Sequence, residues 1–200
     1  MPVTLRNGID RRITMPNWCS NNISIVGNTD TIKQLWEDAT STNEENTERG
    51  LLDAMVPMPE ELNGTTAPGD APNWYSWRVE NWGTKWDVST EGLEFIDHGD
   101  GTAVIQGWFD SAWSPPIGAY EKFTDAMEGI DVEASYYECG MDYAGFWNAW
   151  DGDQCLENLR EQYELPHHER GELYDLYMRL DDEWNLSENF EMWDDEEVES

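Results

Sequence analysis

The stretch NWYSWRVENWGTKWD at residues 73–87 combines a dense set of aromatic side chains with two cations. It contains four of the chain's twelve tryptophans and two of its eleven basic residues: Trp74, Trp77, Trp82, Trp86, Arg78 and Lys85. Each buried aromatic ring removes roughly 150–250 Å² from water, so such a stretch forms either a packing nucleus or an exposed recognition surface. Two interpretations stay open: a helix that covers the core, or a pocket, completed by Trp113, that binds a ligand or a partner.

Spacing within this stretch predicts a helix followed by an extended segment. Trp74, Trp77 and Arg78 recur at helical intervals, and so do Arg78 and Trp82. Gly83 interrupts the pattern before the strand-like TKWDV.

The charge balance restricts the class of partner. The chain has 43 acidic and 11 basic residues, a formal net charge of -32. That charge repels nucleic acid and anionic lipid, so we expect no direct nucleic-acid partner and no membrane partner. Three explanations remain open: adaptation to a saline cytoplasm, solvated charge without a partner, or imitation of the phosphates that a DNA-binding protein recognises.

Acidic residues are concentrated in the C-terminal half of the sequence. They form a candidate surface for a host protein with a basic face, and the alternative is that they only keep the chain soluble. The candidate residues are Asp181, Asp182, Glu183, Asp194, Asp195, Glu196 and Glu197.

The order of predicted elements indicates an α+β fold. A strand at 17–26, with Cys19, Ile23 and Ile25 on one face, precedes a helix at 30–39 capped by Thr29 or Asp30. A hairpin at 93–109 turns at HGDG, and a helix after Pro115 and Pro116 leads to strands at 132–140 and 142–152. This order predicts a ferredoxin-like βαββαβ antiparallel sheet with two helices on one face and one added strand.

Domain organisation follows from this order. We expect a flexible leader at 1–14, a ferredoxin-like domain at 15–150 with a Trp-rich insertion at 51–87, and an acidic helical extension at 151–200. The extension contains helical patterns at 155–165 and 172–184.

The three cysteines, Cys19, Cys139 and Cys155, lack a CxxC pair, which is typical of a reducing cytoplasm. If the first strand lies beside the fourth, Cys19 and Cys139 are neighbours, and we expect both to be free thiols. No stretch approaches the roughly 20 apolar residues of a transmembrane helix.

Four segments carry a resemblance to a known family: MPNWCSNNISIVG from Met15, LLDAMVPMPEEL at 51–62, NWYSWRVENWGTKWD at 73–87 and FDSAWSPPIGAYEKF at 109–123. In this order they resemble the YubB-like family of phage and plasmid proteins. The resemblance covers about residues 15–150. It implies a ferredoxin-like domain and a mobile-element, intracellular setting, and it supplies no catalytic residues.

Motifs for catalysis are missing from the sequence. It has no phosphate-binding glycine loop before a helix, no G-x-S-x-G elbow and only three histidines. We therefore expect no enzyme, no cofactor and no metal.

The sheet face opposite the helices carries Glu94, Asp110 and Glu133 without a base, which disfavours RNA binding. We expect the C-terminal helices to cover this face, or a partner to bind it.

Three functions remain. The first is a phage- or plasmid-encoded interaction protein that binds and inhibits a host defence or DNA-processing protein, by nucleic-acid mimicry. The second is a protein that sequesters a nucleotide-like signal, stacking its ring on the tryptophans and holding its phosphate with Arg78 and Lys85. The third is a salt-adapted accessory domain.

Overall fold

The computed structural model describes residues 17–42, 47–66, 72–166 and 173–190. Six strands form one antiparallel sheet in the order β2-β3-β1-β4-β5-β6. The strands are β1 (Trp18–Asn28), β2 (Leu93–Asp97), β3 (Thr102–Ala112), β4 (Asp131–Glu138), β5 (Tyr143–Asn148) and β6 (Gly152–Glu157). The helices are α1 (Thr29–Ala39), α2 (Leu51–Met55), the 3-10 helix η1 (Glu60–Leu62), α3 (Trp74–Trp82), α4 (Ile117–Ala126), α5 (Leu159–Glu164) and α6 (Tyr174–Trp184).

Strand β1 lies at the centre of the sheet and alternates as predicted. Cys19, Ile23 and Ile25 are buried, while Ser20 and Ser24 on the other face are partly exposed. The predicted pairing of the first strand with the fourth is confirmed. Cys19 and Cys139 are free thiols, as expected, and Cys155 is free as well; Cys19 is buried and the other two are exposed.

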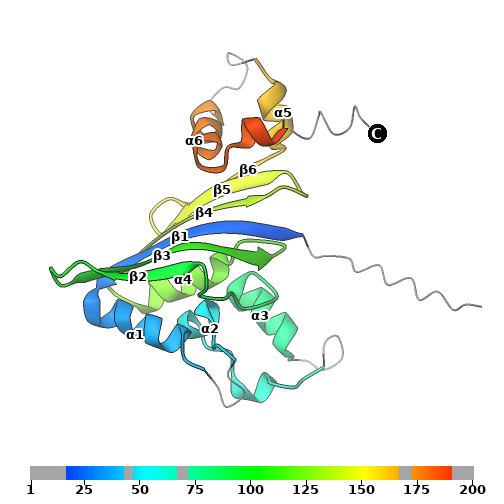
Figure 1. The fold of residues 1–200 in the computed structure, drawn as a ribbon. Coiled ribbons are helices and arrows are strands. Elements are labelled where there is room, and N and C mark those ends of the chain that lie inside the picture. Colours follow the sequence, from blue (N-terminus) through cyan, green and yellow to red (C-terminus); the bar gives the residue numbers. More distant parts are fainter. Residues whose placement is uncertain (1–16, 43–46, 67–71, 167–172, 191–200) are drawn as a thin grey trace, which may run out of the picture.

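One layer of helices covers one face of the sheet. Figure 1 shows α1 to α4 below the strands. Their apolar residues meet those of β1, β3 and β4 in the main core, which includes Ile32, Leu52, Trp82, Ile105 and Tyr120. Helix α1 begins one residue earlier than predicted, because the side chain of Asn28 accepts from the N–H of Thr31 and caps it in place of Thr29 or Asp30.

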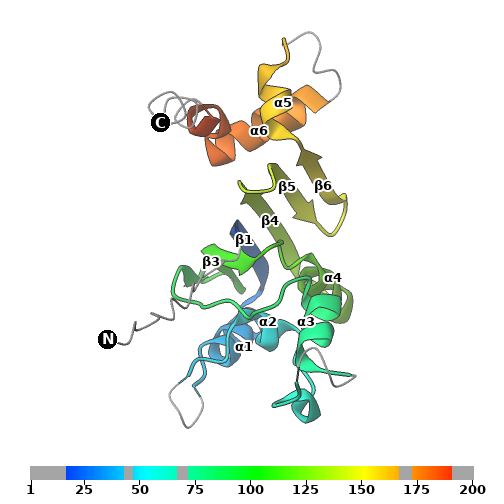
Figure 2. The same ribbon diagram turned by 90° about the vertical axis from the view of Figure 1, so that its right-hand side faces the viewer.

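Helices α5 and α6 lie on the opposite face, at the β4–β6 end of the sheet (Figures 1 and 2). A second core joins them to the sheet; its buried members are Ala144, Leu156, Leu159, Tyr177, Leu180, Leu186 and Phe190. The expected covering of this face by C-terminal helices is therefore seen at this end.

The helix predicted from Cys155 is wrong for its first residues. Residues 152–157 form strand β6 and extend the sheet, so the expected extension does not begin as a helix. The Asn148 side chain accepts from the N–H groups of Trp150 and Asp151, and Gly152 adopts a φ of 71°. These features form a tight turn that returns the chain along β5, which outweighs the helical spacing of Leu156 and Leu159.

The molecule is thus a mixed α+β protein with a six-stranded antiparallel sheet and several helices. Among the described helices, none combines the length and the apolar character that crossing a bilayer requires.

Candidate functional site

The Trp-rich stretch forms the predicted helix, but the strand-like segment expected at 84–88 begins with bends and joins no strand of the sheet. Asn73 caps α3 by accepting from the N–H of Ser76 at 3.0 Å, and Gly83 ends it with a φ of 86°. The next residues are fixed to the end of β3, because Thr84 donates to the carbonyl of Ala112 and Ser114 donates to the carbonyl of Gly83. These bonds place the residues after α3 beside the β3–α4 connection.

Arg78 belongs to a partly buried cluster on α3. Its guanidinium lies 4.8 Å from the Trp82 ring centroid and 5.5 Å from that of Trp74. Trp82 is fully buried, packs edge-on against Trp77 and donates to the carbonyl of Val56. This cluster therefore fastens α3 to the core.

The guanidinium of Arg78 also lines a cavity of about 700 Å³ beside Asp53 and Asp87. Its Nε is buried and makes no hydrogen bond, and no described acid forms an ion pair with it within 4.0 Å. Burial lowers the pKa of Arg78, opposed by the negative charges of Asp87 and Asp53. The cation is thus balanced by these carboxylates at longer range.

Lys85 belongs to a second, exposed cluster. Its ammonium lies 4.4 Å from the ring centroid of Trp86 and 5.4 Å from that of Trp113. Trp18 packs against Trp86 at 5.9 Å, and Tyr75 packs edge-on against Trp113 at 6.4 Å. We call these five residues the Lys85 cluster.

The Lys85 cluster is open to solvent. Trp18, Trp86 and Trp113 are 45%, 36% and 39% exposed. Within the described ranges Lys85 forms no ion pair, although the chain has about four acids for each base. Trp and Tyr side chains contribute much of the binding energy of protein interfaces. A group of exposed aromatic side chains around a cation without an ion pair in these ranges is therefore typical of a binding surface.

The backbone of Trp113 is strained in support of this cluster. Its φ is 71°, a region that a bulky residue rarely adopts. Its N–H donates to the carbonyl of Asn17, and its own carbonyl accepts from the hydroxyl of Tyr143. Strain of this kind is concentrated at functional sites, where the surrounding structure holds the residue in place.

The predicted pocket residues form two groups, which touch where Trp74 packs edge-on against Tyr75 at 5.8 Å. Trp74, Trp77, Arg78 and Trp82 form the inner cluster, whereas Lys85, Trp86 and Trp113 form the exposed one. Sequence reasoning missed Trp18 and Tyr75 as members of the exposed cluster. Tyr75 lies within the Trp-rich stretch, but only the pairing of Trp18 with Ala112 between β1 and β3 brings Trp18 there.

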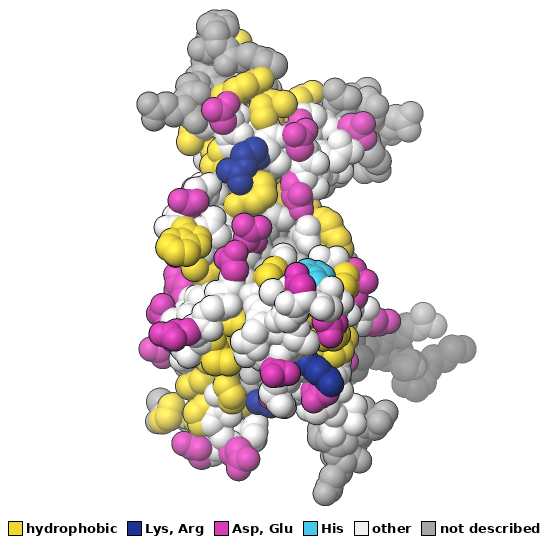
Figure 3. Space-filling model, turned by 90° about the vertical axis from the view of Figure 1, so that its left-hand side faces the viewer, with side chains coloured by type: hydrophobic (Ala, Val, Ile, Leu, Met, Phe, Trp, Pro, Cys, Tyr) yellow, Lys and Arg dark blue, Asp and Glu magenta, His cyan; other side chains and the backbone are white. Residues whose placement is uncertain are grey.

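Members of the predicted acidic surface have different environments. Asp181 accepts from the N–H and hydroxyl of Ser187, and Glu183 accepts from Asn22 and Ser135 of the sheet. Asp182 is exposed, and Asp194, Asp195, Glu196 and Glu197 lie outside the described residues. Figure 3 shows acidic side chains spread over the visible face from end to end rather than gathered in one place.

The described residues give little support for a nucleophilic cysteine or for a metal site. Burial raises the pKa of the Cys19 thiol to about 12, and it also raises the pKa of Cys139 and Cys155, so none is an activated thiolate at neutral pH. In the ranges that the structure covers, no three His, Cys, Asp or Glu side chains are grouped as a metal site.

Comparisons with protein-family models, with curated proteins and with solved structures find no match. The resemblance to the YubB-like family stays a prediction.

Proposed function

We propose that this chain is a binding protein that recognises another protein through the Lys85 cluster. The observation that carries this proposal is the group of exposed indoles, Trp18, Trp86 and Trp113, held around an ammonium that has no ion pair with any described residue. Rigid aromatic side chains give large contact area with little loss of conformational entropy, and such residues are the usual hot spots of interfaces.

The charge of the chain defines the partner's character. A net charge of -32 draws a basic protein toward this surface and accelerates their encounter at low salt. Because the acids are spread over the face seen in Figure 3, they contribute to the rate and the choice of partner, while the Lys85 cluster supplies the specific contact. Imitation of a nucleic-acid backbone would need a concentrated acidic face, so we rank this version of the proposal lower.

A nucleotide-like ligand is the second candidate, favoured by the position of Lys85 over two exposed rings. A base could stack on Trp86 while Lys85 contacts its phosphate. The field of a strongly acidic chain opposes the approach of a polyanion, so we rank this function below a protein partner.

The origin of the protein and the place where it acts are also part of this proposal. We assign strands β1 to β4 and helices α1 and α4 to a ferredoxin-like unit. Strands β5 and β6 extend the sheet of this unit. With the YubB-like resemblance, this assignment supports a phage- or plasmid-encoded protein that acts in the cytoplasm of a host cell and inhibits a defence or DNA-processing protein.

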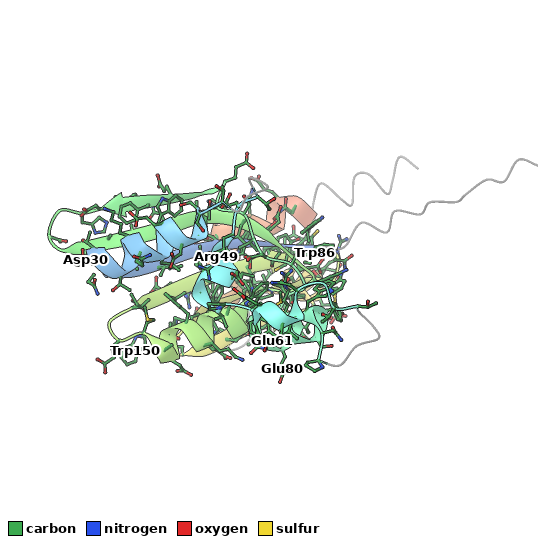
Figure 4. All side chains as sticks on the ribbon, turned by 90° about the horizontal axis from the view of Figure 1, so that it is seen from below. Asp30, Arg49, Glu61, Glu80, Trp86 and Trp150 are labelled. Carbon is green, nitrogen blue, oxygen red and sulfur yellow. The ribbon has the colours of Figure 1, made fainter. Side chains whose placement is uncertain are left out.

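Site-specific photo-crosslinking tests this function. A photoreactive residue placed at Asn17, which is exposed and precedes Trp18 of the cluster, is compared with one at Trp150, which is 89% exposed and lies on the other side from Trp86 in the view of Figure 4. We expect a host protein with a basic surface to be captured from position 17 only. Purified, that protein should bind Trp86→Ala at least tenfold more weakly than wild type, and Trp150→Ala equally well.

Two outcomes would reject the proposal. Capture of the same proteins from both positions would mean that the cluster has no special role. A fluorescence response to a nucleotide panel that disappears in Lys85→Ala, without any protein captured at position 17, would replace it with the small-molecule function.

A further inference from the structure

On the sheet face opposite α1–α4, helix α6 contacts Asn22 of β1 and Trp108 of β3 but leaves open space beside them. Two adjoining cavities, of about 600 Å³ and about 270 Å³, lie along it and share the lining residues Asn22, Ile23 and Ser24. The first extends to β2 and Trp108, and the second reaches Arg179 and Glu183 of α6. Together they form one groove that crosses the strands, which we call the cross-strand groove.

Strand register places a row of polar side chains along the floor of this groove. Glu94 pairs with Gln106, Gln106 with Ser24, Ser24 with Glu133, and Glu133 with Asn148, so the row crosses five strands. Neighbouring strands are about 4.8 Å apart, so the Glu94 and Glu133 positions, three strand spacings apart, are separated by roughly 14 Å.

Two carboxylates stand in this row, and no described base forms an ion pair with either of them. Glu133 is exposed and has no hydrogen-bond or ionic partner among the described residues, and Glu94 accepts only from the neutral amide of Gln106, at 2.9 Å. Arg179 lies at the far end, stacked 4.4 Å from the ring centroid of Phe146. The span between Glu94 and Glu133 is therefore suited to positive charge.

The groove also has an aromatic wall that is held in place. Trp108 is 49% exposed and packs edge-on against Trp184 of α6, with ring centroids 5.1 Å apart. Glu183 accepts from Asn22 at 2.9 Å and from Ser135 at 3.0 Å, which fastens α6 to the sheet beside the groove. A cation that enters thus meets a fixed indole as well as carboxylates.

We propose that the cross-strand groove binds an extended segment of a partner protein that carries two Lys or Arg side chains four positions apart. An extended chain advances about 3.3–3.4 Å per residue, and residues i and i+4 project to the same side roughly 13–14 Å apart. That span equals the separation of Glu94 and Glu133. The groove is distinct from the Lys85 cluster and recognises different chemistry.

Fluorescence anisotropy with labelled synthetic peptides tests this inference. One peptide carries two lysines four positions apart in a Ser/Ala background, and an isomer of the same composition carries them side by side. We expect the first to bind the full chain about threefold more tightly, because only this peptide reaches both carboxylates at once.

Variants of the chain separate the groove from general charge attraction. The double variant Glu94→Gln with Glu133→Gln should bind the first peptide about tenfold more weakly, and Trp108→Ala should also weaken it. The control, Glu121→Gln with Glu128→Gln, makes the same change of net charge at exposed residues of α4 and the turn after it, and should change binding less than twofold. Trp86→Ala should leave peptide binding intact, so a failure of the Lys85 cluster is distinguished from a failure of the groove.

Several results would overturn the inference. Equal weakening by the groove and control variants, or equal binding of the two isomers, would reduce the effect to net charge. Displacement of the peptide by spermine at equal concentration would assign the groove to a small polyamine instead. Absence of binding at low salt would end the proposal outright.

Discussion

The Asp87 carboxylate accepts a hydrogen bond from the backbone N–H of Leu52 at 2.8 Å, 35 residues earlier in the chain. It also accepts from the N–H of Asp53, and together these bonds cap the N-terminus of α2. The N-cap residue itself is Gly50, which has no side chain to do so. The Trp-rich segment and α2 are therefore joined by one carboxylate.

Gly50→Ala should disrupt this junction. Gly50 has a φ of 95°, and an added Cβ would lie 2.5 Å from the Asp87 Cγ, so the variant combines backbone strain with a steric clash. We expect urea unfolding to show a loss of about 2–4 kcal/mol. Gly64→Ala is the matched control, since Gly64 has a φ of 78° and nothing within 4 Å; it should lose only about 1 kcal/mol. Equal losses of stability in the two variants would show that the clash with Asp87 contributes nothing.

Titration of Asp87 should make stability depend on pH. Burial raises its pKa from 3.8 to about 6, although hydrogen bonds from Val88, Leu52 and Asp53 oppose the shift. The folded state therefore holds the proton more tightly than the unfolded state. The resulting stability is complete below about pH 4 and is lost as pH rises through 6. Since one pKa unit equals about 1.4 kcal/mol, we expect wild type to lose roughly 2 kcal/mol relative to Asp87→Asn between pH 4 and 7, measured by urea unfolding. Parallel pH profiles of the two proteins would contradict this.

Substitutions at Trp113 should reveal the strain in its backbone. Both Trp113→Ala and Trp113→Gly remove the indole, but only glycine adopts the observed φ of 71° without cost. We expect the glycine variant to be more stable than the alanine variant by about 1 kcal/mol in urea unfolding. An alanine variant that equals or exceeds the glycine variant would show that this backbone is relaxed.

Removal of Glu183 should loosen α6. Glu183→Ala leaves the Asn22 amide and the Ser135 hydroxyl without their acceptor, at a cost of about 1–3 kcal/mol. Asp182→Ala, one residue away and exposed, should cost less than about 0.5 kcal/mol. Urea unfolding followed by tryptophan fluorescence measures both, because Trp184 is adjacent. Similar losses for the two variants would mean that Glu183 does not fasten the helix.

Local patterns predicted the sheet core well, because alternation and turn residues act over short distances. The alternation of Cys19, Ile23 and Ile25 and the turn at 98–101 led to the observed β1 and to the β2–β3 hairpin. The edge strand β6 was missed, because Leu156 and Leu159 have helical spacing and only the turn after Asn148 opposes it.

The candidate site was predicted only in part, because tertiary contacts assemble it. Trp86 and Lys85 were identified from the sequence, but Trp18 joins them through strand pairing. Glu183 was expected to face a partner, whereas its carboxylate is used within the molecule. No local pattern distinguishes an acid that contacts its own sheet from one that faces solvent.

The order of the strands leaves β2 and β6 as the two outer strands of the sheet. An outer strand can hydrogen-bond to a second molecule and begin an aggregate. Here β2 carries Glu94 and Asp97, and β6 carries Asp153 and Glu157, all four exposed. Any two such strands brought together would set carboxylates against carboxylates, so the acidity that we propose selects a basic partner would also keep copies of this chain apart at high concentration.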